Sequence, residues 1–227
     1  HQLDITDPSS RNNLINFIKT KYQKLDILVN NAGMAYKCAS EAPFSEQAEV
    51  TNTCNYYGTK SLTVEMLGEG IFDNNNSRVL FCSSLCSDTS YAKCSKSVQN
   101  ALKNDIKTVE ELDDVVNDFI DLAEDNTSHT EKYSNSAYGM SKVFVRKLCY
   151  ILAENPNYGS HIRFYSYCPG WCKTDMAGYE KPPLTAEEGA QISYWLGTTQ
   201  DEVVVQNNGG YFRNGDKLCQ WGYVDGE

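Results

Sequence analysis

The chain has 227 residues, of which 41% are hydrophobic, and this size and composition suit one domain built around a single core. Its 20 lysines and arginines stand against 30 aspartates and glutamates, so the formal net charge is −10. A surface of this charge repels nucleic-acid phosphates and anionic lipids, and no apolar run approaches the ~18 residues of a membrane span. We therefore expect a globular protein that binds neither nucleic acid nor membranes.

The nine cysteines favour a reducing compartment, because the chain opens HQLDIT, without the basic and apolar segments of a secretory signal. Three residues separate Cys82 from Cys86 and Cys168 from Cys172, whereas zinc knuckles and redox motifs have two. With only three histidines in the chain, no metal site is predicted. The thiols are expected to be reduced and the protein cytoplasmic.

The first predicted element is an amphipathic helix over residues 8–24. Asp7 followed by Pro8 is typical of a helix start, and apolar residues then recur at helical spacing. The short apolar run 25–29 follows and ends in Asn30-Asn31-Ala32-Gly33. This pattern predicts a buried parallel strand that breaks into a tight turn.

Two further strands are predicted, at 79–82 and at 163–168, and Pro169-Gly170 ends the second. Helical patterns lie between and after the strands, at 46–67, at 136–154 and from Thr185 onward, where Glu188 completes a capping box. Because strands alternate with helices, we expect a layered α/β fold with a parallel sheet.

Residues 91–135 interrupt this alternation. They carry apolar residues at helical spacing among many acids, from Leu102 to Leu122, but no strand pattern. The segment predicts two small helices that pack as an insertion on the outside of the sheet. Since no repeat or flexible linker divides the chain, residues 1–227 are expected to form a single domain that contains this insertion.

Few residues could carry chemistry, since the chain has no nucleophile elbow, no paired histidine ligands and no phosphate loop. Tyr138 and Lys142 are four positions apart, so a helix would place the phenol and the ammonium on one face. A nearby cation lowers the pKa of a phenol from about 10 by ~1–3 units, which makes it a usable proton donor for a carbonyl oxygen. Tyr56 and Lys60 have the same spacing, and for any one such pair the simpler interpretation is a solvated helix face. The two pairs differ in their place in the chain, because Tyr138 follows the strand that ends in Ser83-Ser84, whereas Tyr56 precedes it.

Six stretches of the chain resemble, in matching order, the short-chain dehydrogenase/reductase family, and within it the cytosolic carbonyl reductases. They are residues 4–7, 28–33, 55–59, 83–84, 138–142 and 168–176. The resemblance covers nearly the whole chain and implies a doubly wound, Rossmann-type parallel sheet with flanking helices. The implied activity is the NADPH-dependent reduction of ketones, aldehydes or quinones to alcohols.

The resemblance implies catalytic roles for four polar side chains. Tyr138 would protonate the substrate oxygen as hydride arrives from the nicotinamide, while Lys142 would lower the pKa of Tyr138 and hold the nicotinamide ribose. Ser84, rather than Ser83, would hydrogen-bond the same oxygen. Asn55 would hold a water that relays protons to Lys142. The structural alternatives are a strand-end turn for the serines and a solvent-facing or capping role for Asn55.

The resemblance also implies a cofactor side and a substrate side. The expected NADP(H) contacts are Asp4, Ile5, Asn31, Ala32, Gly33, Tyr138, Lys142, Pro169, Gly170 and Thr174. Gly170 and Thr174 follow a parallel strand, at the edge where ligands of open α/β sheets bind. Trp171 and Met176 would line the substrate side with Ser84, although ordinary core packing explains them nearly as well.

Two features of the chain bear on the protein's assembly and completeness. The long separation between Ser84 and Tyr138 matches a helical insertion of carbonyl reductases that covers the surface other members use to dimerise, so a monomer is expected. Family members begin with a strand, a Gly-rich turn and a helix that binds pyrophosphate. Because His1 matches about the third strand, roughly 60 residues in two strand–helix units are expected to be missing. The 227 residues alone are then expected to bind cofactor weakly and to expose apolar sheet near a strand at Leu3–Ile5.

Two other functions fit the same residues. A non-catalytic relative, genuinely short at its start, would use the remaining sheet as a binding module. The scaffold would alternatively carry another oxidoreductase reaction, on an alcohol, a steroid or a pterin. A Gly-rich turn encoded upstream of His1 would favour the enzyme, a start codon there would favour the binding module, and substrate profiling would separate the third function.

Overall fold

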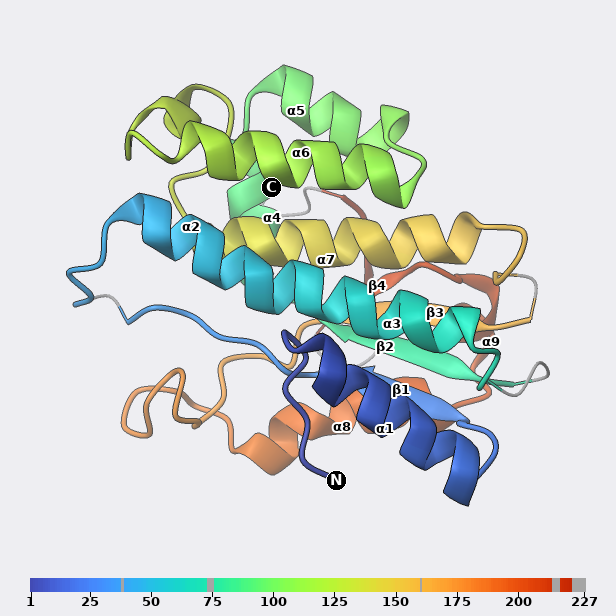
Figure 1. The fold of residues 1–227 in the computed structure, drawn as a ribbon. Coiled ribbons are helices and arrows are strands. Elements are labelled where there is room, and N and C mark those ends of the chain that lie inside the picture. Colours follow the sequence, from blue (N-terminus) through green and yellow to red (C-terminus); the bar gives the residue numbers. More distant parts are fainter. Residues whose placement is uncertain (38, 73–75, 160, 214–216, 222–227) are drawn as a thin grey trace.

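The computed structural model of the chain describes residues 1–37, 39–72, 76–159, 161–213 and 217–221. A five-stranded sheet in the order β1-β2-β3-β4-β5 lies at its centre (Figure 1). The strands are β1 (Ile27–Asn30), β2 (Arg78–Cys82), β3 (Arg163–Tyr167), β4 (Tyr211–Arg213) and β5 (Lys217–Cys219). The pairs from β1 to β4 are parallel, and β5 runs antiparallel to β4. The expected parallel α/β sheet is confirmed.

Helices cover both faces of the sheet. On one face lie α1 (Pro8–Lys21), α2 (Phe44–Asn52), α3 (Thr59–Gly68) and α7 (Ala137–Glu154), and on the other lie α8 (Ala186–Thr198) and α9 (Glu202–Gln206). Strand β2 shows the division, because Val79 and Phe81 join the core on the α7 side whereas Leu80 joins Leu196 and Val204 on the α8 side. A strand buried on both faces accounts for the continuous apolar run in its sequence.

The predicted helix starts are confirmed by their caps. Asp7 accepts a hydrogen bond from the Ser9 amide (2.9 Å) at the start of α1. In front of α8, Thr185 and Glu188 form both hydrogen bonds of a capping box, at 3.1 Å and 2.7 Å. Each cap satisfies amide groups that the first helical turn leaves without an intrahelical acceptor.

Residues 44–68 form one helix that contains a π-helical turn at Thr53–Gly58, between α2 and α3. The predicted helix over 46–67 is therefore confirmed, but the π turn was not predicted. Apolar spacing over a long helix does not reveal one wider turn, because the pattern on either side still fits a helix. Asn55 and Tyr56 lie in this turn, and both are buried.

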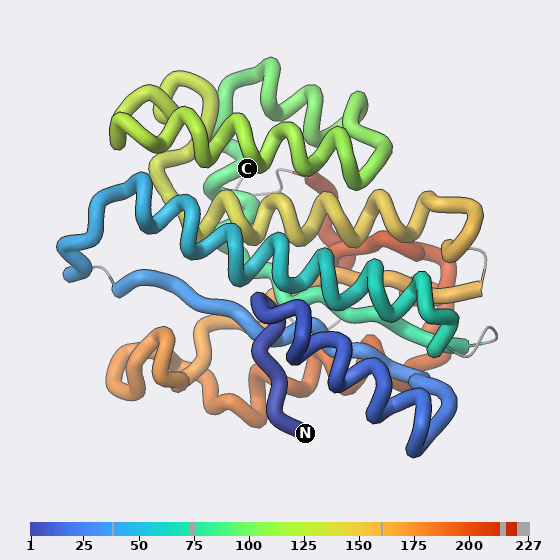
Figure 2. Tube along the Cα trace, in the orientation of Figure 1, coloured from blue at the N-terminus to red at the C-terminus, as the bar shows by residue number. Residues whose placement is uncertain are grey.

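The predicted insertion is helical, but it does not pack on the sheet. It includes the last turn of α4 (Leu85–Lys93), then α5 (Lys96–Asn100), a second π turn (Ala101–Asp105), α6 (Val109–Leu122) and a short 3₁₀ turn (Ser128–Glu131). Helix α6 buries Leu112, Val116 and Phe119, and Phe119 contacts Phe44 of α2 and Phe144 of α7. Since α2 and α7 already cover the sheet, α6 forms a further layer outside them (Figure 2).

The predicted strand at Leu3–Ile5 is wrong. These residues are irregular, and the Ile5 carbonyl accepts a hydrogen bond from the Arg11 guanidinium (2.8 Å) rather than from a strand. A strand needs a neighbour to pair its backbone groups, and no described strand lies beside this segment. At this edge of the sheet, exposed apolar residues lie on β1, where Ile27 is 36% and Val29 is 41% exposed.

The short strands β4 and β5 were also not predicted, because three residues are too few to show an alternating pattern. Among the described residues, no helix combines the length and the apolar character needed to cross a bilayer.

Candidate active site

The site lies where the carboxyl ends of β1 and β2 meet the first turns of α7. Ser83 and Ser84 directly follow β2. The Ser83 hydroxyl donates to the Lys142 carbonyl oxygen (2.9 Å), and the Lys142 ammonium donates to the Cys82 carbonyl oxygen (2.8 Å). These two bonds fix the face of α7 that carries Lys142 to the end of the strand.

Three of the four predicted catalytic side chains come together at this point. The Ser84 hydroxyl acts on the Tyr138 hydroxyl as a hydrogen-bonding group that lowers the pKa of Tyr138, and the Lys142 ammonium lies 5.6 Å from the centre of the Tyr138 ring. Ser84 also accepts from the Cys86 amide (3.2 Å) as the cap of α4. Ser83 is 1% exposed and holds the backbone of α7, so the two adjacent serines have different surroundings.

Burial controls the ionisation of this cluster. It raises the pKa of Tyr138 above its ordinary value of 10.0, and the hydrogen bond from Ser84 acts in the opposite direction but less strongly. Burial also lowers the pKa of Lys142 below 10.5. The expected lowering of the Tyr138 pKa is therefore not found in this structure, because the removal of the phenolate from water dominates, and it is Ser84 rather than Lys142 that opposes it. At neutral pH the Tyr138 phenol keeps its proton.

Asn55, in the π turn, is 1% exposed and holds the loop that follows β1. Its Oδ1 accepts from the Met34 amide (2.7 Å), and its Nδ2 donates to the Met34 carbonyl oxygen (2.9 Å) and to the Ser141 hydroxyl (3.0 Å). The solvent-facing alternative for Asn55 is therefore wrong. Sequence reasoning did not single out Met34 or Ser141, although Ser141 stands inside the stretch 138–142.

Gly33 brings the backbone of this loop close to Lys142 of α7. A Cβ at this position would lie 3.1 Å from Asn55 Oδ1 and 3.4 Å from Lys142 Nζ. Lys142 has one hydrogen-bond acceptor among the described residues, Cys82, whereas an ammonium group can donate three hydrogen bonds. The spare donors beside a glycine backbone fit the hydroxyl groups of a nicotinamide ribose. Asn31 and Ala32, in the same loop, are exposed.

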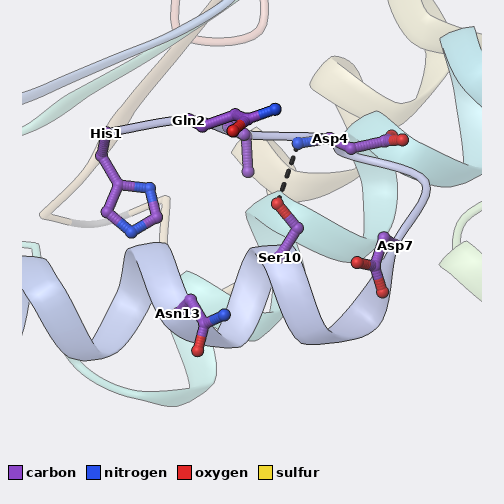
Figure 3. A pocket seen from close by; sticks show the side chains of 7 residues that line it. His1, Gln2, Asp4, Asp7, Ser10 and Asn13 are labelled. Carbon is purple, nitrogen blue, oxygen red and sulfur yellow. Dashed lines mark hydrogen bonds between the residues drawn. The ribbon is translucent and has the colours of Figure 1, made fainter.

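Ile5 contacts the π turn at its end, since a Cβ at Gly58 would lie 2.9 Å from Ile5 Cγ1. Asp4 lines an open pocket of about 440 Å³ together with His1, Gln2, Leu3, Asp7, Ser10 and Asn13 (Figure 3). The Asp4 carboxylate accepts from the amide (2.9 Å) and the hydroxyl (2.7 Å) of Thr6, which holds its pKa below the usual value. The structure thus does not bring Asp4 into the cluster around Tyr138.

The residues predicted after β3 lie in an exposed loop next to the start of α4. Cys168 Sγ accepts from the Leu85 amide (3.2 Å) and from the Gly170 amide (3.4 Å), which joins the ends of β2 and β3. Gly170, which follows Pro169, has a φ of +84°, a conformation that favours glycine. Figure 1 shows the orange loop that precedes α8 on the same side of the molecule as the start of α7.

Trp171, Met176 and Thr174 belong to the same loop, and the first two are exposed to solvent. Trp171 is 53% and Met176 is 40% exposed, so the core-packing alternative for both is wrong. Thr174 accepts from the Ala177 amide (3.4 Å) within a turn of this loop. Leu85, which was not singled out from the sequence, adds an apolar side chain that is 43% exposed directly after Ser84.

Comparison with known proteins gives a consistent set of relatives. The family model described as short chain dehydrogenase matches residues 1–117. Carbonyl reductase [NADPH] 1 of Bos taurus is 35% identical over 224 residues, which span 97% of this chain and 79% of that protein. The Mus musculus protein of the same name is 38% identical over 199 residues, spanning 86% of this chain and 70% of that protein.

Solved structures agree on the fold. Salutaridine reductase from Papaver somniferum is 28% identical, with a TM-score of 0.76 over 94% of this chain and 81% of that one. Carbonyl reductase Sniffer of D. melanogaster is 20% identical, with a TM-score of 0.62 over 97% of this chain and 77% of that one.

Proposed function

The chain belongs to the short chain dehydrogenase family of oxidoreductases, which use nicotinamide cofactors, and on this premise we propose that its protein reduces carbonyl compounds with NADPH. The observation that carries the proposal is the meeting of Ser84, Tyr138 and Lys142 at the carboxyl end of β2. Relatives named carbonyl reductase [NADPH] 1 support both the cofactor and the substrate class.

In the proposed reaction the hydroxyls of Ser84 and Tyr138 hold the substrate oxygen. A reduced nicotinamide, when bound, supplies the hydride. Tyr138 is protonated at neutral pH because burial raises its pKa, so it can donate a proton as negative charge develops on that oxygen. Lys142 stabilises the tyrosinate that remains and holds the ribose through its spare donors. Asn55 fixes the loop beside Lys142, and a proton relay through a water at Asn55 stays a prediction.

Exposed apolar residues near the site support an apolar substrate such as a ketone, an aldehyde or a quinone. Leu85, Trp171 and Met176 expose apolar side chains on the segments that follow β2 and β3. The proposal also includes a monomeric, cytoplasmic protein, and α6 supports the monomer. Its burial against Phe44 and Phe144 covers helix surface that a second subunit would otherwise contact.

The substitution Tyr138→Phe tests the function, because it removes the proton donor and keeps the ring. Consumption of NADPH with a quinone or an aromatic aldehyde is expected to fall about 10³-fold in the full-length protein. Thermal unfolding and far-UV circular dichroism should match those of the wild type. Tyr194→Phe, which removes a hydroxyl from a side chain that is 69% exposed, is the control and should keep full activity. Unchanged turnover in Tyr138→Phe would refute the assignment.

A further inference from the structure

The second tyrosine–lysine pair, Tyr56 and Lys60, is not a solvated helix face. The Tyr56 hydroxyl donates to Asp113 Oδ1 (2.8 Å), and the Lys60 ammonium donates to Asp113 Oδ2 (2.6 Å). Tyr56 is fully buried, and the side chains of Lys60 and Asp113 are 18% and 26% exposed. One carboxylate of the insertion therefore holds both members of the pair, away from the cluster around Tyr138.

A second bond joins the same two elements. Asp113 and Asn117 lie one turn apart on α6, and Asn117 Oδ1 accepts from the Tyr57 hydroxyl (2.5 Å). Tyr56 and Tyr57 are consecutive residues of the π turn, directly after Asn55. The insertion thus binds the part of the helix that carries a predicted catalytic residue.

The contacts continue from the π turn to Lys142. Asn55 binds the backbone of Met34 on one side and the Ser141 hydroxyl, next to Lys142, on the other. Met34 follows Gly33, whose backbone runs beside the Lys142 ammonium. A displacement of Asn55 would therefore move both the loop after β1 and the face of α7 that presents the lysine.

A π turn needs tertiary contacts to persist. π-helical hydrogen bonding is rare because it is less favourable than α-helical bonding, and a helix that loses the extra residue turns the following side chains by about 100°. Asp113 opposes this relaxation, because its two oxygens bind side chains from the π turn and from the first turn of α3. Burial and the Asp113 carboxylate also raise the pKa of Tyr56, so this hydroxyl remains a donor at every physiological pH.

We propose that Asp113 is a positioning residue for the reaction, which holds Tyr56 and Lys60 so that the π turn keeps Asn55 against Met34 and Ser141. The insertion then has two roles, because it covers α2 and α7 and also holds the π turn of the active site in place. The catalytic consequence rests on the proposed function, whereas the effect on the Met34 loop does not.

The chain contains a matched control on the same helix. Asp118 of α6 accepts from the Lys132 ammonium (3.0 Å) and from the Tyr133 hydroxyl (2.7 Å), so it also binds one lysine and one tyrosine. Both of those partners belong to the insertion itself. The substitution Asp118→Asn therefore measures the general effect of the loss of such a carboxylate from α6.

The test compares Asp113→Asn and Asp118→Asn in the full-length protein, by hydrogen exchange of the Met34 amide and by steady-state reduction of a quinone. In Asp113→Asn the Met34 amide is expected to exchange at least tenfold faster. The kcat is expected to fall about tenfold with KM for the quinone unchanged, and the pH profile of kcat should shift. Asp113→Glu should restore part of both effects. Asp118→Asn should stay within twofold of the wild type in exchange and in kcat.

The possible failures are distinguishable. If Asp113→Asn matches Asp118→Asn in exchange and in kcat, Asp113 has no positioning role, and the proposed function stands. If the wild-type protein reduces no carbonyl compound with NADPH, the proposed function fails, and the exchange of the Met34 amide alone decides whether Asp113 holds the π turn. If the two variants lose the same thermal stability, a lower kcat in Asp113→Asn alone is caused by the displacement of the π turn and not by unfolding.

Discussion

Two lysines on α7 show how burial acts on one residue type in different surroundings. Lys142 is 4% exposed and donates to the Cys82 carbonyl oxygen. Lys147 is 0% exposed, and its ammonium has no hydrogen-bond acceptor among the described residues, although it lies 4.9 Å from the centre of the Tyr150 ring. Burial, with a smaller contribution from Lys107, lowers the pKa of Lys147 to about 8. An unpaired ammonium in this position destabilises the folded state as long as it carries its charge.

The pH dependence of stability follows from this pKa. Between pH 8 and 10.5 the unfolded chain keeps the proton on Lys147 that the folded chain has lost, so the free energy of unfolding rises with pH, by about 1–3 kcal/mol in total. Lys147→Met is therefore expected to be more stable than the wild type at pH 7, with a difference that disappears towards pH 10.5. Urea unfolding at several pH values measures this.

Lys93→Met, at an exposed position of α4, is the control. Its free energy of unfolding should change with pH in the same way as that of the wild type. A constant difference between Lys147→Met and the wild type would contradict the assigned pKa.

At the scale of elements, the close approach of α4 to α7 sets the distance between Ser84 and Tyr138. Gly139, the residue after Tyr138, makes this approach possible, because a Cβ there would lie 2.0 Å from the Ser90 hydroxyl oxygen of α4. The hydroxyl oxygen of Ser136, the cap of α7, would lie 2.9 Å from the same Cβ. The contact between the helices leaves no space for a methyl group at this position.

Gly139→Ala is expected to lower the free energy of unfolding by about 1–3 kcal/mol, since α4 has to move away from α7. It should also reduce kcat, because Ser84 is the N-cap of α4 and would move with it. Gly68→Ala is the matched substitution, at a helical glycine of α3 that has no atom within 4 Å of the added Cβ. There the change should stabilise the protein by about 0.5–1 kcal/mol. Chemical denaturation and turnover measure both, and equal effects at the two positions would argue against the close contact.

At the scale of the whole molecule, a buried ionic group joins three parts of the fold. Asp88 of α4 is 0% exposed and accepts from Arg146 of α7 (2.6 Å), while Arg213 of β4 lies 3.6 Å from its other oxygen. Arg146 also stacks on Tyr211 (4.0 Å) and on Trp221 (4.5 Å). The helical layer is thereby connected to the far edge of the sheet.

Loss of the central charge should be costly, because it removes the carboxylate that binds the buried guanidinium group of Arg146. Asp88→Asn is expected to lower the free energy of unfolding by about 3–5 kcal/mol, measured by urea denaturation. Asp118→Asn, which removes a pair whose side chains are 49% and 40% exposed, should lose less than about 1 kcal/mol. Similar losses in the two variants would show that the buried group contributes no more than a surface pair.

The sequence by itself was sufficient for features that depend on neighbouring residues. The caps of α1 and α8 follow from Asp7 and from Thr185 with Glu188, and β1, β2 and β3 follow from short apolar runs. The spacing of Tyr138 and Lys142 placed both side chains on one face of a helix, because helical geometry alone relates positions four apart. All of these features depend on forces that act within a few residues of the chain.

Only the tertiary structure decided what depends on contacts between distant segments. It turned Leu3–Ile5 into irregular chain, added β4 and β5, and put α6 on α2 and α7 rather than on the sheet. It also raised the pKa of Tyr138, since burial is a property of the whole fold. The partners of Asn55 and Asp113 lie far away in the sequence, and hydrogen bonds of about 3 Å form only once packing has brought such groups together.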